Sequence, residues 1–209
     1  MIIYKKLICI VVLISFLIGS SCALANSELA EESFIDNYKE GLWALDEIEG
    51  DVIISSVNGE ITHGDRLRIR IPIAGNCHLA NVVTSFLTYN KNTDIKNIRD
   101  REGTAHFGVS PIKVNYLFST KLIGNSFLIW VDLGWYKISE LKRNLENTVS
   151  VKVTLDHNDI FPANDYFDVR INTWPTNGMA EVIDKSVKIC HKLLGKDDDK
   201  NMKKVVSNR

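Results

Sequence analysis

Residues 66–73 alternate between charged and apolar side chains, and this alternation constrains the fold more than any other feature of the sequence. The apolar positions are Leu67, Ile69, Ile71 and Ile73, and the cationic positions are Arg66, Arg68 and Arg70. Successive side chains of a strand point to opposite faces, so a period of two predicts a strand with one face on a core and one in water. Pro72 lacks an amide donor, which predicts an edge position or a bulge near the end of the strand.

The first 25 residues have the organisation of a secretory signal peptide. Lys5 and Lys6 precede an apolar run at residues 7–18, and Ala23-Leu24-Ala25 provides a cleavage site. The run is shorter than the roughly 20 residues that span a bilayer. We therefore expect export to a periplasm or beyond, with no transmembrane segment after cleavage. A lipid anchor at Cys22 is the alternative, because small residues precede this cysteine.

Cleavage would leave two cysteines, Cys77 and Cys190, in an oxidising compartment. An even pair in such a compartment predicts one disulfide. Each cysteine precedes a histidine, His78 or His191, so a Cys₂His₂ metal site is the alternative. Adjacent side chains diverge on a strand or a helix, whereas metal motifs separate their ligands by two or more residues. The sequence thus favours the disulfide, with no metal and no cofactor.

Periodicity and turn residues predict the remaining elements. Strands are expected at 52–57, 60–62, 79–89, 105–119, 127–133, 149–155 and 166–171. Asn58-Gly59 is the pair that a two-residue hairpin turn prefers, so it should join the first two of these strands. Apolar side chains on both faces of residues 127–133 predict a central strand.

Helices are expected at 28–40, 139–147 and 179–194, the last of them ended by Gly195 and carrying Cys190 toward the sheet. The fold class is mainly β or α+β: an antiparallel β-sandwich-like domain with an N-terminal helix, a short inter-strand helix and a C-terminal helix tied on by the disulfide. The domain should cover residues 26–195, followed by a charged disordered tail at 196–209.

The order of elements from Leu133 to Cys190 resembles small periplasmic β-sandwich proteins such as the invasion-associated locus B family. The shared order is a strand, a short leucine-bearing helix, two strands and a helix ending in a cysteine. The resemblance implies a non-enzymatic periplasmic protein linked to the interaction of bacteria with host cells. It does not extend to the first half of the chain, where the cysteine placement of that family is not matched.

Charge and motifs argue against several functions, although catalytic residues can also assemble from distant positions. Without Lys5 and Lys6 the chain has 23 basic and 26 acidic residues, so no basic excess predicts a nucleic-acid partner. The chain contains none of the local signatures of hydrolases, zinc proteases or phosphate-binding loops. Asp156-His157-Asn158-Asp159 could hold a base or a cation, but such a run more often forms a turn. His63 and His106 are isolated in the sequence.

Aromatic residues at strand ends are the best candidates for a contact surface. The patch that we predict consists of Trp135, Tyr136, Trp174, Arg66, Arg68 and Arg70, whereas Trp130 is expected in the core. The sequence therefore predicts an exported, non-enzymatic binding or protein-interaction protein of unknown ligand. The alternative is a small carbohydrate-binding or hydrolytic domain of the cell envelope.

Overall fold

The computed structural model describes residues 42–62, 64–90, 93–122, 124 and 126–206 of the 209-residue chain. The expected signal peptide, Cys22, the expected helix at 28–40 and His63 lie outside the described residues.

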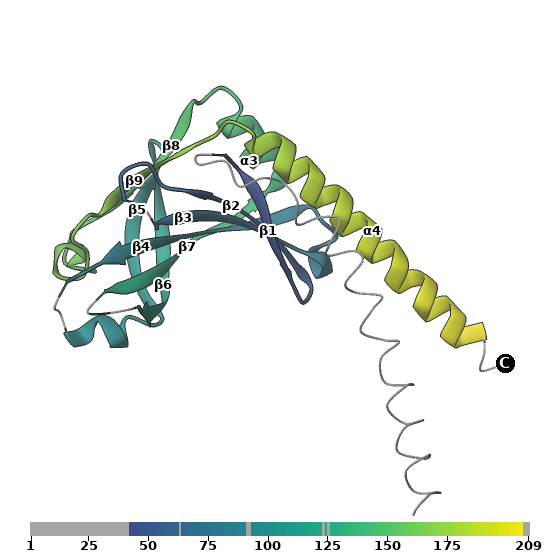
Figure 1. Cartoon of the computed structure of the whole chain (residues 1–209), viewed down its shortest axis with the longest axis horizontal. Coiled ribbons are helices and arrows are strands. Elements are labelled where there is room, and N and C mark those ends of the chain that lie inside the picture. Colours follow the sequence, from purple (N-terminus) through teal and green to yellow (C-terminus); the bar gives the residue numbers. More distant parts are fainter. Residues whose placement is uncertain (1–41, 63, 91–92, 123, 125, 207–209) are drawn as a thin grey trace, which may run out of the picture. The chain divides into compact units, whose positions relative to one another are not determined.

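Within the described residues, nine antiparallel strands form one hydrogen-bonded sheet, in the order β1-β2-β3-β4-β7-β6-β5-β8-β9 (Figure 1). The strands are β1 (Ala44–Glu49), β2 (Val52–Asn58), β3 (Arg66–Pro72), β4 (Leu79–Thr88), β5 (Arg101–Phe107), β6 (Ser110–Lys121), β7 (Phe127–Lys137), β8 (Ser150–Leu155) and β9 (Ile171–Pro175). β7 lies at the centre of this order, as its apolar sequence predicted.

Short helical segments connect the strands, and a long helix follows the last one. These elements are η1 (Ile73–Gly75), η2 (Thr93–Asn97), α3 (Ile138–Leu145), η3 (Ala163–Asp165) and α4 (Met179–Val206). The antiparallel β-rich class, the short inter-strand helix and the C-terminal helix are confirmed.

The core lies on one face of the sheet, which we call the inner face. Burial alternates along β3, with Leu67, Ile69 and Ile71 on the buried side, as the sequence predicted. Phe86 of β4 shares this face and contacts the ring of Trp174 edge-to-face at 6.1 Å between centroids. α4 packs against β2 and β3 from the same side.

A buried hydrogen bond, 2.8 Å long, joins Ser186 Oγ of α4 to Ser55 Oγ of β2. Ser186 also donates to the carbonyl of Val182 one turn earlier. Because a buried hydroxyl is costly without a partner, this pair fixes where α4 lies on β2.

The first and last parts of the sheet are joined by the loop at residues 59–65. Glu60 N–H donates to the Thr173 carbonyl of β9 at 2.8 Å, and Ile61 N–H donates to Asn172 Oδ1 at 3.0 Å. Asn172 Nδ2 in turn donates to Asp65 Oδ2 at 2.7 Å. The sheet is a single open sheet, and these bonds bring its last strand, β9, close to β2.

This loop corrects the prediction of a two-residue hairpin. Asn58 is the last residue of β2 and pairs with Arg66, so residues 59–65 form the connection and 60–62 are not a strand. A Cβ at Gly59 would lie 2.4 Å from Asn172 Nδ2. The glycine is thus required for close approach to β9, and long-range contacts override the local turn preference.

Three further boundaries differ from the predictions. The run at 105–119 is split into β5 and β6 by Gly108, whose φ of 63° reverses the chain. The strand expected at 166–171 begins only at Ile171, because Tyr166 and Phe167 follow η3 and are buried in an aromatic cluster. α4 does not end at Gly195 but continues to Val206, since an interior glycine costs a helix only about 1 kcal/mol.

β3 is an interior strand, not the edge strand that Pro72 suggested. It pairs with β2 on one side and with β4 on the other. The ladder with β4 ends at Arg70, two residues before Pro72. The missing amide donor therefore lies beyond the last pair with β4, where it costs no ladder bond.

Candidate functional site

The register of three strands brings predicted contact residues together on the face opposite the core. Arg70 pairs with Asn81, and Asn81 pairs with Trp135, so the three form one row across β3, β4 and β7. Arg66 begins a parallel row through Ser85 to Trp130. We call this surface the arginine–tryptophan face, and its members are Arg66, Arg68, Arg70, Asn81, Trp130, Asp132 and Trp135.

Arg68 is held in place by aromatic and polar contacts. Its guanidinium lies 4.0 Å from the centre of the Trp130 ring, and Nη1 donates to Ser85 Oγ at 3.1 Å. Phe118 of β6 stacks on the same indole, with centroids 5.4 Å apart. Burial, assisted by the charge of Arg66, lowers the pKa of Arg68 to about 10, so the side chain remains a cation at neutral pH. The face thus carries a fixed positive charge that needs little ordering on binding.

Trp135 is the exposed aromatic of the face, with 59% of its surface accessible. A β-bulge between β4 and β7 precedes it, and Gly134 in this bulge has a φ of 105°. Asn81 Nδ2 donates to Asp132 Oδ1 at 2.7 Å and to the Gly134 carbonyl at 3.2 Å. The bulge therefore places an exposed indole beside Asn81, which is itself buried and holds the Asp132 carboxylate in place.

The face has a small excess of positive charge. Arg66 Nη1 lies 3.4 Å from Asp46 Oδ2 of β1, and its Nε donates to Asn58 Oδ1 at 3.2 Å. With Asp46 included, three arginines face two aspartates, which leaves a net charge of +1. The arginine row is half-buried and partly paired, and not simply a solvated stripe as expected.

The other two predicted aromatics are not on this face. Trp174 lies inside β9 and is fully buried, so its assignment to a contact patch was wrong; the misplaced strand boundary explains the error. Tyr136 points to the inner side, where its hydroxyl donates to the Leu133 carbonyl at 2.8 Å. Burial raises the pKa of Tyr136.

Tyr136 lines a groove of about 620 Å³ between α3, β8 and the β5–β6 hairpin. Its apolar lining includes Phe107, Leu141, Leu145 and Val151. β5 pairs with β8 over three residue pairs, and Gly108 N–H then donates to the Lys152 carbonyl at 2.7 Å beside the groove. The groove is an apolar hollow without a cluster of ionisable groups.

The Asp156–Asp159 segment forms the turn that the sequence favoured. Asn158 Oδ1 accepts hydrogen bonds from Ile160 N–H and Phe161 N–H, both 3.0 Å long. Asp156 bonds to His106 Nδ1 at 3.1 Å and to Thr104 Oγ1 at 2.7 Å. The Thr104 hydroxyl thus donates to the carboxylate and not to the imidazole, so this arrangement is not that of a nucleophile and its base.

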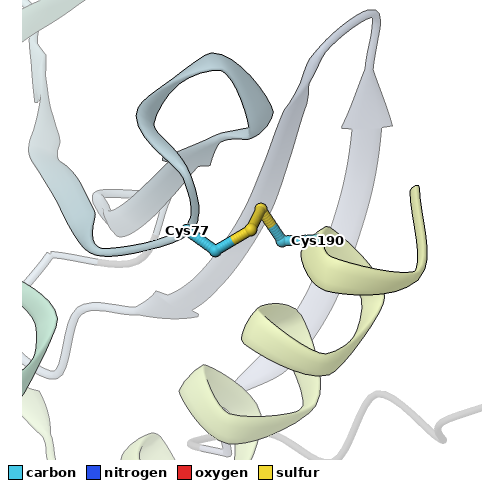
Figure 2. The surroundings of a disulfide bond; sticks show 2 residues. All are labelled: Cys77 and Cys190. Carbon is cyan, nitrogen blue, oxygen red and sulfur yellow. A yellow bond between two sulfur atoms is a disulfide. The ribbon is translucent and has the colours of Figure 1, made fainter. Parts of the chain in front are cut away.

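The predicted disulfide is present between Cys77 and Cys190, with Cα atoms 5.9 Å apart (Figure 2). Cys77 follows η1, and Cys190 lies on the side of α4 that faces the sheet. The two sulfur atoms are bonded to each other, so they do not form the thiolate pair of a Cys₂His₂ site. Among the residues that the structure describes, no group of three or more histidine, cysteine or acidic side chains could hold a metal ion.

No family model, no curated protein and no solved structure matches this chain. The resemblance to the invasion-associated locus B family therefore stays a prediction. Over the described part of the chain, no helix is both long enough and apolar enough to cross a membrane.

Sequence reasoning missed three members of the face, Asn81, Trp130 and Asp132. Trp130 and Asp132 alternate with the buried Ile129, Val131 and Leu133, so a period-two reading of β7 would have placed them opposite the core. β4 is buried on both faces and Asn81 is itself buried, so no alternation in β4 marks its side. The bulge at Gly134 breaks that period before Trp135, and no feature of the sequence marks its position.

Proposed function

We propose that this chain is an exported, non-enzymatic binding protein that uses the arginine–tryptophan face to bind an acidic segment of a partner protein. The observation that carries the proposal is the row Arg70–Asn81–Trp135 with the Arg68–Trp130 stack beside it. Arginine and tryptophan are the residue types that dominate binding energy in protein interfaces. Export rests on the signal-peptide pattern of the first 25 residues.

Photo-crosslinking in the cells that make the protein tests this function. A benzophenone amino acid at position 135 should give a discrete adduct, whereas the same group at position 181, an exposed site on α4, should not. The substitution Arg70→Glu should abolish the adduct at position 135, because it reverses the charge beside the crosslinker. Equal adducts from positions 135 and 181, or an adduct that survives Arg70→Glu, would contradict the proposed face.

A carbohydrate-binding domain of the cell envelope is the second candidate. The observation that favours it is the exposed indole of Trp135 near the Asp132 carboxylate, which the buried Asn81 amide orients, since sugars stack on aromatic rings and bond to oriented polar groups. Titration with soluble cell-wall glycans should then change the tryptophan fluorescence of the protein. Trp135→Ala should remove the change and Trp43→Phe should keep it, because Trp43 is buried elsewhere.

A further inference from the structure

The disulfide brings two histidines together outside the arginine–tryptophan face. His78 and His191 each follow one of the bonded cysteines, and their rings lie 6.4 Å apart between centroids at an angle of 68°. Both side chains are exposed. We propose that the two imidazoles form a binding site for one divalent transition-metal ion, Cu²⁺ or Zn²⁺, with water completing the coordination.

The backbone that carries His78 is held in an unusual conformation. Asn76 and Cys77 both have positive φ, 51° and 59°, although neither is glycine. His78 N–H donates to the Gly75 carbonyl at 3.3 Å, and its own carbonyl accepts from Ile138 N–H at 3.0 Å. Two consecutive left-handed residues persist only where the surroundings impose them, and such strain gathers at functional sites. The position of His78 is thus fixed by η1, by α3 and by the disulfide.

The ring separation suits two ligands of one ion. Metal–nitrogen bonds of about 2.0–2.1 Å place the centroids of two ligating imidazoles about 5 to 6 Å apart. The observed 6.4 Å lies just above this range, so rotation of the two exposed side chains has to turn a nitrogen of each ring toward the ion. Imidazole is a preferred ligand of both ions, and the affinity order of divalent metals places Cu²⁺ above Zn²⁺.

The surroundings leave space for an ion without strong repulsion. The histidines line a hollow of about 490 Å³ beside the disulfide. Two lysines also line it, but Lys142 Nζ lies 2.7 Å from Asp184 Oδ1 and Lys137 Nζ lies 3.5 Å from Glu140 Oε1. Because each ammonium is paired with a carboxylate, the hollow has little net charge to oppose a cation.

Calorimetric titration of the untagged, oxidised mature protein with CuCl₂ and ZnCl₂ tests the site. We expect one ion bound per chain, and an affinity at least tenfold lower in either His78→Gln or His191→Gln. His106→Gln and His157→Gln are matched controls, since they remove imidazoles elsewhere in the described structure, and both should keep the full affinity. Circular dichroism and an absence of free thiols confirm that each variant is folded.

Electron paramagnetic resonance of the Cu²⁺-loaded protein provides a readout of ligand identity. Hyperfine coupling from two imidazole nitrogens, lost in either His78 or His191 variant and kept in both controls, supports the site. Coupling from one imidazole alone, or affinities that are the same in all four variants, would overturn it. These outcomes are independent of the crosslinking experiment, because neither histidine belongs to the arginine–tryptophan face.

Discussion

Asp65 should make the stability of this protein fall as the pH rises from about 4 to 6. Its carboxyl is 1% exposed and joins the loop at 59–65 to β4 and β9, through the amide of Leu87 and the side chain of Asn172. Burial raises its pKa from 3.8 to about 6, against the opposing effect of these two hydrogen bonds. One pKa unit corresponds to about 1.4 kcal/mol, so the ionised carboxylate costs the fold about 3 kcal/mol above pH 6.

The direction in which stability changes with pH follows from proton linkage. Below pH 3.8 the carboxyl is protonated in both the folded and the unfolded chain, and the fold has its full stability from this group. Between 3.8 and about 6 the unfolded chain ionises first, so unfolding becomes easier as the pH rises. Above about pH 6 both states are ionised, and this contribution stays constant.

Urea denaturation of the wild type and of Asp65→Asn, from pH 4 to pH 7.5, isolates the effect. The variant cannot titrate at this position, so the difference in unfolding free energy should move by about 2 to 2.5 kcal/mol in favour of the variant between pH 4 and pH 7, because part of the effect already lies below pH 4. A constant offset from altered hydrogen bonds does not affect this slope. Asp159→Asn, in an exposed turn, controls for the loss of one acid. A difference that varies by less than 0.5 kcal/mol, on the order of one third of a pKa unit, would refute the reasoning.

Three further predictions concern stability, each measured by chemical denaturation. Replacing both Cys77 and Cys190 by alanine should lower the free energy of unfolding by about 4 to 5 kcal/mol, because the disulfide joins residues 113 positions apart and so closes a long loop in the unfolded chain. A loss below about 1 kcal/mol would contradict this. Gly59→Ala should lower the free energy of unfolding by about 1 to 3 kcal/mol because the new Cβ clashes with Asn172. Gly195→Ala, in open space on α4, should raise it by up to about 1 kcal/mol, and equal effects of the two substitutions would exclude the close contact. Arg68→Ala should cost about 1 to 2 kcal/mol by uncovering Trp130, and Arg68→Lys should restore less than half of it.

Local patterns predicted the parts of the fold that depend on neighbours in sequence. The alternation in β3, the apolar run of β7 and the helical face that carries Cys190 all appear where expected. Errors arose where distant contacts decide the conformation. Gly59 lies close to Asn172, which is more than 100 residues away in the sequence. The dipeptide Asn58-Gly59 therefore does not form the two-residue turn that it predicts locally.

The candidate site, too, could be predicted from local patterns only in part. The sequence identified Trp135 and the three arginines as surface candidates, but it could not show that they share a face, since this depends on which strands are neighbours. β4 and β7 are far apart in the chain and adjacent in the sheet, and only their pairing places Asn81 beside Trp135. Trp174 was misplaced because its strand was predicted several residues too early.

The contacts that join the two ends of the sheet also constrain when the chain can fold. The bonds from Asn172 to Asp65 and to Ile61 span 107 and 111 residues, and the disulfide spans 113. Each of these contacts requires residues from the last part of the chain, and contacts of such high sequence separation form slowly. During synthesis, β2 and β3 therefore lack their contacts with β9 and with α4 until the chain has been made as far as these two elements. Over this interval the apolar side of β3 has no helix to cover it, and protection from aggregation must come from elsewhere.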